Sequence, residues 1–136
     1  KEIHIFIDLC ATGTKQERND KINRLIQGVY SIAMFMIESG IPQAYIWYDK
    51  VNGVIQEYSV EQEEELYWMF QELFRSKTTT EESELMEAYV DWGKGRLLES
   101  ALYLTVADHE SLDSGNLVRD RLEVMDLRGD VIEDQE

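Results

Sequence analysis

An apolar run at residues 3–7, IHIFI, leads directly into Asp8 and then into a short polar loop that reaches Gly13. Such a run is typical of a strand that is buried on both faces of a parallel sheet. In open α/β sheets ligands bind beyond the carboxyl ends of the strands, so Asp8 is the first candidate site residue. An Asp after a strand also serves as the N-cap of a following helix, and the local sequence leaves both roles open.

Length and composition favour a single domain over residues 1–136. With 43% hydrophobic residues, a chain of this length can build its own core. The net charge of -15 repels nucleic acid and anionic lipid headgroups, so no nucleic-acid partner is expected. The densest apolar stretch, residues 29–37, is shorter than the roughly 18 residues that span a bilayer, so we expect no direct membrane insertion.

Cys10 is the only cysteine, which excludes an internal disulfide and favours a reducing, cytoplasmic setting. The chain begins with Lys1 rather than Met and enters a predicted strand at once. We therefore expect it to be a fragment of a longer protein.

Apolar residues recur with helical spacing from residue 22 to residue 37, and Gly40 marks the end of this long helix. Its second half, residues 29–37, is apolar nearly all round, which predicts burial on more than one side. Two β-rich runs at residues 44–48 and 54–58 flank Asn52-Gly53, a pair typical of a tight turn. An antiparallel hairpin is predicted there.

Two capping-box patterns predict where the next two helices begin. Ser59 with Gln62 precedes a helix that runs to Arg75. Its broad apolar stripe is expected to pack on the sheet and consists of Leu66, Tyr67, Met69, Phe70, Leu73 and Phe74. Thr79 with Glu82 precedes a further helix that ends near Gly93.

A second apolar run at residues 101–107 ends in Asp108 and repeats the arrangement at Asp8. Beyond it, residues 117–121 predict a short helix, and residues 122–127 with Val131 and Ile132 predict one or two last strands. This order of elements predicts a three-layer α/β/α domain of Rossmann-like type. Its central sheet is mostly parallel, with one antiparallel hairpin strand.

Polar side chains from three loops should meet at the carboxyl edge of this sheet. They come from Asp8, Cys10 and Thr12, from the threonines at residues 78–80, and from Asp108 with His109. Carboxylate and hydroxyl oxygens are the ligands that Mg²⁺ prefers. The sequence therefore makes this edge a candidate Mg²⁺ site.

The same residues resemble the metal-ion-dependent adhesion site of the von Willebrand factor A (VWA) domain. That site uses Asp-x-Ser-x-Ser after the first strand, a Thr in a later loop and an Asp after the fourth strand. The order of elements is also similar to that fold over nearly the whole chain. The closest resemblance is to bacterial VWA-like domains of unknown function whose genes often lie beside those of MoxR-type AAA+ ATPases.

The resemblance implies a non-enzymatic protein-interaction module, with a MoxR-type AAA+ ATPase as partner. It also implies a cytoplasmic domain of a membrane-anchored protein, since proteins of this family often carry an N-terminal membrane-spanning region. By position, the implied metal ligands are Asp8, Cys10, Thr12, Thr79 and Asp108. Cys10 places a soft sulfur where the family has a hard oxygen, so the site is degenerate, and we expect weak or no Mg²⁺ binding that Cys10→Ser should strengthen.

An enzymatic alternative uses the same loop. Asp8-Leu9-Cys10-Ala11-Thr12 also resembles the Asp-x-Asp-x-Thr loop of haloacid-dehalogenase-like, Mg²⁺-dependent phosphatases, in which the first Asp attacks phosphorus. Cys10 stands in place of the general acid and base, so such an enzyme is expected to be inactive. A nucleophilic pair of Cys10 and His109 is a further reading, but acidic surroundings would raise the pKa of the thiol.

Overall fold

The computed structural model describes residues 2–93, 96–112 and 118–129, the last segment with backbone only at 119–121. Five strands form one sheet in the order β3-β2-β1-β4-β5. The elements along the chain are β1 (Ile3–Ile7), α1 (Lys15–Glu38), β2 (Gln43–Asp49), β3 (Val54–Val60), α2 (Glu63–Arg75), α3 (Leu85–Gly93), β4 (Leu98–Thr105) and β5 (Val118–Asp126). All neighbouring strands are parallel except the β2–β3 pair.

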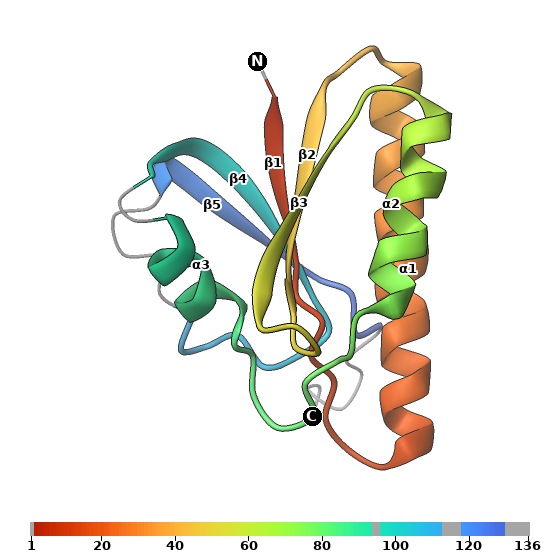
Figure 1. The fold of residues 1–136 in the computed structure, drawn as a ribbon. Helices are drawn as coiled ribbons and strands as arrows, with labels where there is room; N and C mark the ends of the chain where they lie inside the picture. The colour runs from red at the N-terminus through yellow and green to blue at the C-terminus, as the bar shows by residue number, and fades with distance from the viewer. Residues whose placement is uncertain (1, 94–95, 113–117, 130–136) are drawn as a thin grey trace, which may run out of the picture.

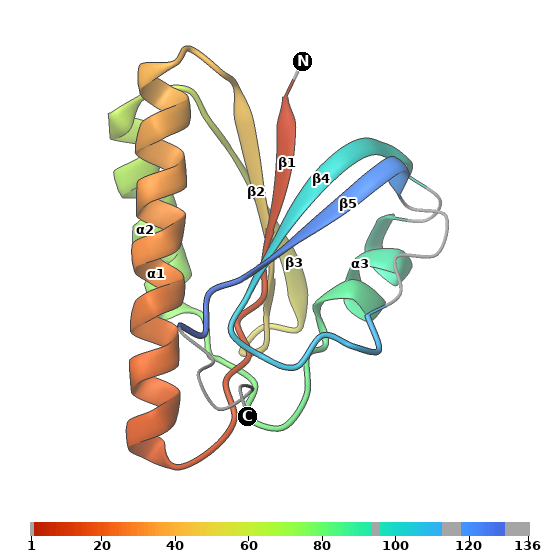
Figure 2. The same ribbon diagram turned by 180° about the vertical axis from the view of Figure 1, so that it is seen from behind.

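The sheet is the middle layer of three. Helices α1 and α2 lie side by side on one face, and α3 lies on the other (Figures 1 and 2). A three-layer α/β fold with one antiparallel hairpin strand is therefore confirmed. β1 is the central strand, and its parallel partners β2 and β4 bring the carboxyl ends of three strands to one edge.

Helix α1 begins earlier than its apolar stripe because Thr14 and Glu17 form a capping box. The Glu17 amide donates to Thr14 Oγ1 at 3.1 Å, and the Thr14 amide donates to Glu17 Oε1 at 2.8 Å. The helix ends before Gly40, whose positive φ of 70° suits glycine. The prediction that its second half is buried on more than one side was wrong, since Tyr30 and Phe35 are exposed and one stripe faces the sheet.

The hairpin forms as predicted, with β2 and β3 paired from Gln43↔Val60 to Asp49↔Val54 around Gly53. The Ser59–Gln62 capping box was wrong, because pairing with β2 extends β3 to Val60 and makes Ser59 a strand residue. Glu65 instead accepts hydrogen bonds from the Glu61 and Gln62 amides at the start of α2. The broad stripe of α2 is also only partly used by the sheet, since Tyr67 and Phe74 are exposed.

The structure also differs from the prediction at the last two predicted helices. Residues 78–84 form a loop in which Thr79 pairs with Cys10, so the Thr79–Glu82 capping box was wrong and α3 begins at Leu85. The short helix predicted at residues 117–121 was wrong, because β5 already pairs with β4 from Leu98↔Val118. Residue 117 and the predicted strand residues Val131 and Ile132 lie outside the described residues.

Each face of the sheet has its own apolar core. Ile7, Trp47 and Leu66 belong to the larger core under α1 and α2. Phe6 and Tyr103 belong to the smaller core with Tyr89 of α3. In the described part of the chain, none of the helices has the length and apolar character that a membrane span requires.

Candidate functional site at the carboxyl edge

Asp8 lies at the centre of this edge because its strand is central. Its amide donates to the carbonyl of Leu104 at 2.9 Å, which continues the parallel β1–β4 pairing by one step. This register places Asp8 beside Thr105, the last residue of β4, and Asp108 follows in the loop beyond. Asp8 and Asp108 therefore lie at the same edge, as the two apolar runs predicted.

The Asp8 carboxylate is buried, with 2% of the residue exposed, and both of its oxygens accept hydrogen bonds. Ser83 Oγ donates to Oδ1 at 2.7 Å, and Thr105 Oγ1 donates to Oδ2 at 2.8 Å. Burial raises the pKa of the Asp8 carboxyl, and the two hydroxyl donors offset part of that rise. Asp8 is thus a hub that joins β1 to the loop before α3 and to the end of β4.

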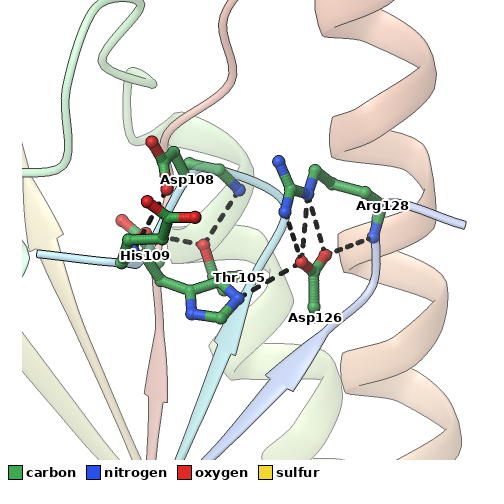
Figure 3. A network of polar contacts seen from close by, with 8 residues as sticks. Thr105, Asp108, His109, Asp126 and Arg128 are labelled. Carbon is green, nitrogen blue, oxygen red and sulfur yellow. Dashed lines mark hydrogen bonds and ion pairs between the residues drawn. The ribbon is translucent and has the colours of Figure 1, made fainter. Parts of the chain in front are cut away.

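The hydroxyl groups around Asp8 have partners of their own. Tyr103 Oη lies 3.1 Å from Ser83 Oγ, so it can donate to Ser83 while Ser83 donates to Asp8. The Ala107 amide donates to Thr105 Oγ1 at 3.0 Å, an interaction visible at Thr105 in Figure 3. Each polar group therefore fixes the next, which holds the loops of the edge in one arrangement.

Thr79 and Cys10 meet through their backbones. The Thr79 amide donates to the Leu9 carbonyl at 2.8 Å, and the Ala11 amide donates to the Thr79 carbonyl at 3.1 Å. The Thr79 hydroxyl also points to the Leu9 carbonyl, at 3.4 Å. Cys10 is fully buried, and this burial raises the pKa of its thiol.

Asp108 and His109 form the rim of the edge (Figure 3). Asp108 is exposed and accepts from the Glu110 amide at 3.1 Å, which stabilises a tight turn. His109 Nε2 lies 3.2 Å from Asp126 Oδ2, and Asp126 also pairs with Arg128 at 2.7 Å. Partial burial would raise the pKa of Asp126, but the hydrogen bonds from Arg128 hold it below its ordinary value.

A cleft of about 480 Å³ opens between the loops of this edge. Asp8, Cys10, Thr12 and Asp108 line it, so four of the five predicted site residues come together. Ser83 and Tyr103 line the same cleft and were missed from the sequence, as was the buried Thr105. Thr105 could have been suspected, because a hydroxyl that ends a buried strand requires a polar partner.

The structure does not bring the five implied ligands together as one set of hard oxygens. Mg²⁺ requires about six oxygen ligands in near-ideal octahedral geometry. Thr79 does not line the cleft and directs its hydroxyl to the Leu9 carbonyl, Cys10 offers sulfur, and each Asp8 oxygen already accepts one hydroxyl donor. Among the described residues, no group of three or more His, Cys, Asp or Glu residues could hold a metal ion.

This geometry changes the result expected for Cys10→Ser. Millimolar Mg²⁺ should leave the melting temperature of the unmodified chain unchanged, and it should also leave that of Cys10→Ser unchanged, because Thr79 remains outside the cleft in both proteins. A folded-state site at a ligand concentration of 100 Kd would add about 2.7 kcal/mol, so thermal unfolding with and without Mg²⁺ is a sensitive measurement. A rise in the melting temperature of the unmodified protein that Asp108→Ala abolishes would contradict this expectation, and NaCl at equal ionic strength is the control.

The burial of Asp8 also predicts a pH dependence of stability. The folded chain binds the Asp8 proton more tightly than the unfolded chain, in which the pKa is about 3.9. The contribution of Asp8 to stability is therefore greatest below about pH 4 and falls as the pH rises through the folded-state pKa. The free energy of unfolding of the unmodified chain minus that of Asp8→Asn should decrease from pH 4 to pH 7.

Urea unfolding at several pH values measures this difference. Equal m values for the two proteins are the control that the unfolded states are alike. If this difference in the free energy of unfolding instead increased with pH, the hydrogen bonds from the hydroxyl groups would lower the pKa of Asp8 by more than burial raises it.

No protein-family model, curated protein or solved structure matches this chain.

Proposed function

We propose that this chain is a non-enzymatic protein-interaction module of VWA type, which binds its partner at the carboxyl edge of the sheet. This proposal rests on the hydrogen bonds that the Asp8 carboxylate accepts from other residues of the chain. Ser83 and Thr105 each donate to one of its oxygens and the residue is only 2% exposed, so the carboxylate at the centre of the edge organises loops. The adhesion site is degenerate as a metal site and acts as a scaffold.

The rim of the cleft supplies groups that a partner can contact. Glu81, Glu82 and Asp108 are exposed there, and His109 is half-buried beside them. Because the loops below are fixed by hydrogen bonds, little conformational entropy is lost when a partner binds to them. A preorganised, acidic rim suits a partner with basic side chains at the contact.

The phosphatase alternative is less well supported by this geometry. A nucleophilic carboxylate must present an oxygen to phosphorus, whereas the Asp8 oxygens accept hydrogen bonds in a residue that is only 2% exposed. The raised pKa of Cys10 also makes it a poor substitute for a general acid and base. Turnover of an aryl phosphate with Mg²⁺ that is lost in Asp8→Asn would favour the alternative.

The family resemblance suggests a MoxR-type AAA+ ATPase as the partner, in the cytoplasm and close to a membrane anchor supplied by other sequence. Binding of the purified chain to such an ATPase tests this proposal directly. Reversing rim charges in Glu82→Lys and Asp108→Lys should weaken binding at least about tenfold, or about 1.4 kcal/mol.

Glu38→Lys is the matched control for these variants, because it reverses an exposed charge at the end of α1, away from the cleft. It should bind like the unmodified chain. Equal losses in all three variants would mean that only net charge matters, and unchanged binding in the rim variants would place the contact elsewhere.

A further inference from the structure

A second surface, separate from the carboxyl edge, lies between α1 and α2. It is a groove of about 620 Å³, which we call the α1–α2 groove. Its lining residues are Ile26, Gln27, Tyr30, Ser31, Tyr67, Phe70 and Phe74.

The groove exposes more aromatic surface than packing on the sheet requires. Tyr67 is 56% exposed and Phe74 is 65% exposed, although α2 buries Leu66 and Leu73 against the sheet. The Phe70 ring stacks on Phe74 with 5.5 Å between centroids and lies 6.4 Å from the Tyr30 ring. Contiguous apolar surface of this kind on a folded domain marks an interaction site.

The shape of the groove suits a helix. α1 and α2 run side by side in opposite directions (Figures 1 and 2). On α2, Tyr67, Phe70 and Phe74 have the i, i+3, i+7 spacing of one helical face. A third helix can place its own apolar ridge between two such rows of side chains.

The charged residues around the α1–α2 groove determine which kind of helix it can bind. The lining residues are uncharged, but Tyr67 Oη lies 3.5 Å from Glu63 Oε2, and Glu64 is exposed beside it at the start of α2. The cations Arg18 and Lys21 of α1 donate to the carbonyls of Gly13 and Thr12, in the loop that leads into α1. Arg75, which follows Phe74, pairs with Glu72 at 2.9 Å. The groove therefore has an acidic flank at its Tyr67 end, on a chain of net charge -15.

The same charge argues against two other occupants. A second copy of this chain would bring another -15 to the contact, and anionic lipid would be repelled. We propose that the α1–α2 groove binds a basic amphipathic helix of another protein. Its apolar face would lie on Tyr30, Phe70 and Phe74, and its Lys or Arg side chains would lie beside Glu63 and Glu64.

This proposal does not depend on the function proposed for the carboxyl edge, and a synthetic peptide tests it. The probe is a helix of about 18 residues with Leu at i, i+3, i+4 and i+7 positions and Lys at the others. One comparison peptide has the same composition in scrambled order, and another has Glu in place of Lys. Titration calorimetry in about 0.15 M salt should detect binding of the Lys helix and at least about tenfold weaker binding of both others.

Two pairs of variants locate the contact. Phe74→Ser should weaken binding of the Lys helix at least about tenfold, whereas Phe35→Ser should not, although Phe35 is 64% exposed on α1. Tyr67→Ser and its neighbour Trp68→Ser form the second pair, since both residues are more than half exposed but only Tyr67 lines the groove. Losses in Phe74→Ser and Tyr67→Ser alone would support the proposal.

The other outcomes would overturn it. Equal binding of the scrambled peptide would indicate charge attraction without a groove, and equal binding of the Glu helix would refute the acidic flank. Equal losses in both members of each variant pair, or no binding at all, would refute the location. Self-association or binding to uncharged phosphatidylcholine vesicles that Phe74→Ser abolishes would assign the groove to a second copy or to a membrane.

Discussion

Trp47→Ala is expected to lower the free energy of unfolding by about 3–5 kcal/mol. Trp47 is fully buried at the centre of β2, stacked on Tyr58 with 5.4 Å between ring centroids. Its indole Nε1 also donates to Ser76 Oγ at 2.8 Å, which fixes the end of α2. The substitution removes apolar contacts, leaves a cavity and releases the segment that leads to Thr79 and Ser83.

Urea unfolding followed by circular dichroism measures the change. Trp68→Ala is the matched control, because this tryptophan of α2 is 58% exposed, and it should change stability by less than about 0.5 kcal/mol. Trp47→Phe retains a ring but loses the bond to Ser76, for which we expect an intermediate loss. Similar losses in Trp47→Ala and Trp68→Ala would contradict the packing described for this face of the sheet.

Phe6→Ala should destabilise the other face by a similar amount, about 3–5 kcal/mol. Phe6 is fully buried on β1, edge-on to Tyr89 at 5.0 Å between centroids and 6.0 Å from Tyr103. Its loss removes the contact that holds α3 on the sheet. It also removes support from the Tyr103 ring, whose hydroxyl contacts Ser83 beside Asp8.

The same unfolding experiment applies, with Phe35→Ala on the exposed side of α1 as control. Hydrogen exchange of amides in α3 should increase more than that of amides in α1, because Phe6 belongs to the core beneath α3. Uniform exchange changes over both helices would show that the two cores are not separable. Domains of this size have a free energy of unfolding of about 5–15 kcal/mol, so either core variant would lose a large part of its stability.

The features of the fold that could be predicted from sequence are those that depend on neighbouring residues. The apolar run that became β1 and the Asn52-Gly53 turn are local patterns and were found in their predicted places, whereas the run predicted at residues 101–107 forms β4 at Leu98–Thr105. Helix starts were less predictable. The Ser59 and Thr79 patterns were overridden because backbone pairing with β2 and with Cys10 claimed those residues for extended structure.

The candidate site divides in the same way. Asp8 and Asp108 could be placed at one edge from sequence, because each follows an apolar run that forms a parallel strand. The hydroxyl donors to Asp8 could not be chosen, since Ser83 and Thr105 lie 75 and 97 positions away in the chain. Helical spacing likewise identified the aromatic residues of α2 but not which of them face outward.

The amino-acid sequence by itself thus determined the order of elements from β1 to β4, the antiparallel hairpin, the net charge and the carboxylates that follow two buried strands. Tertiary structure decided that Ser83 and Thr105 donate to Asp8, that the Thr79 hydroxyl is directed to the Leu9 carbonyl, and that Tyr67 and Phe74 remain outside the core. The physical reason is that hydrophobic periodicity is a local property of a few consecutive residues. Strand register and helix packing are set by contacts between distant segments, which the local pattern does not encode.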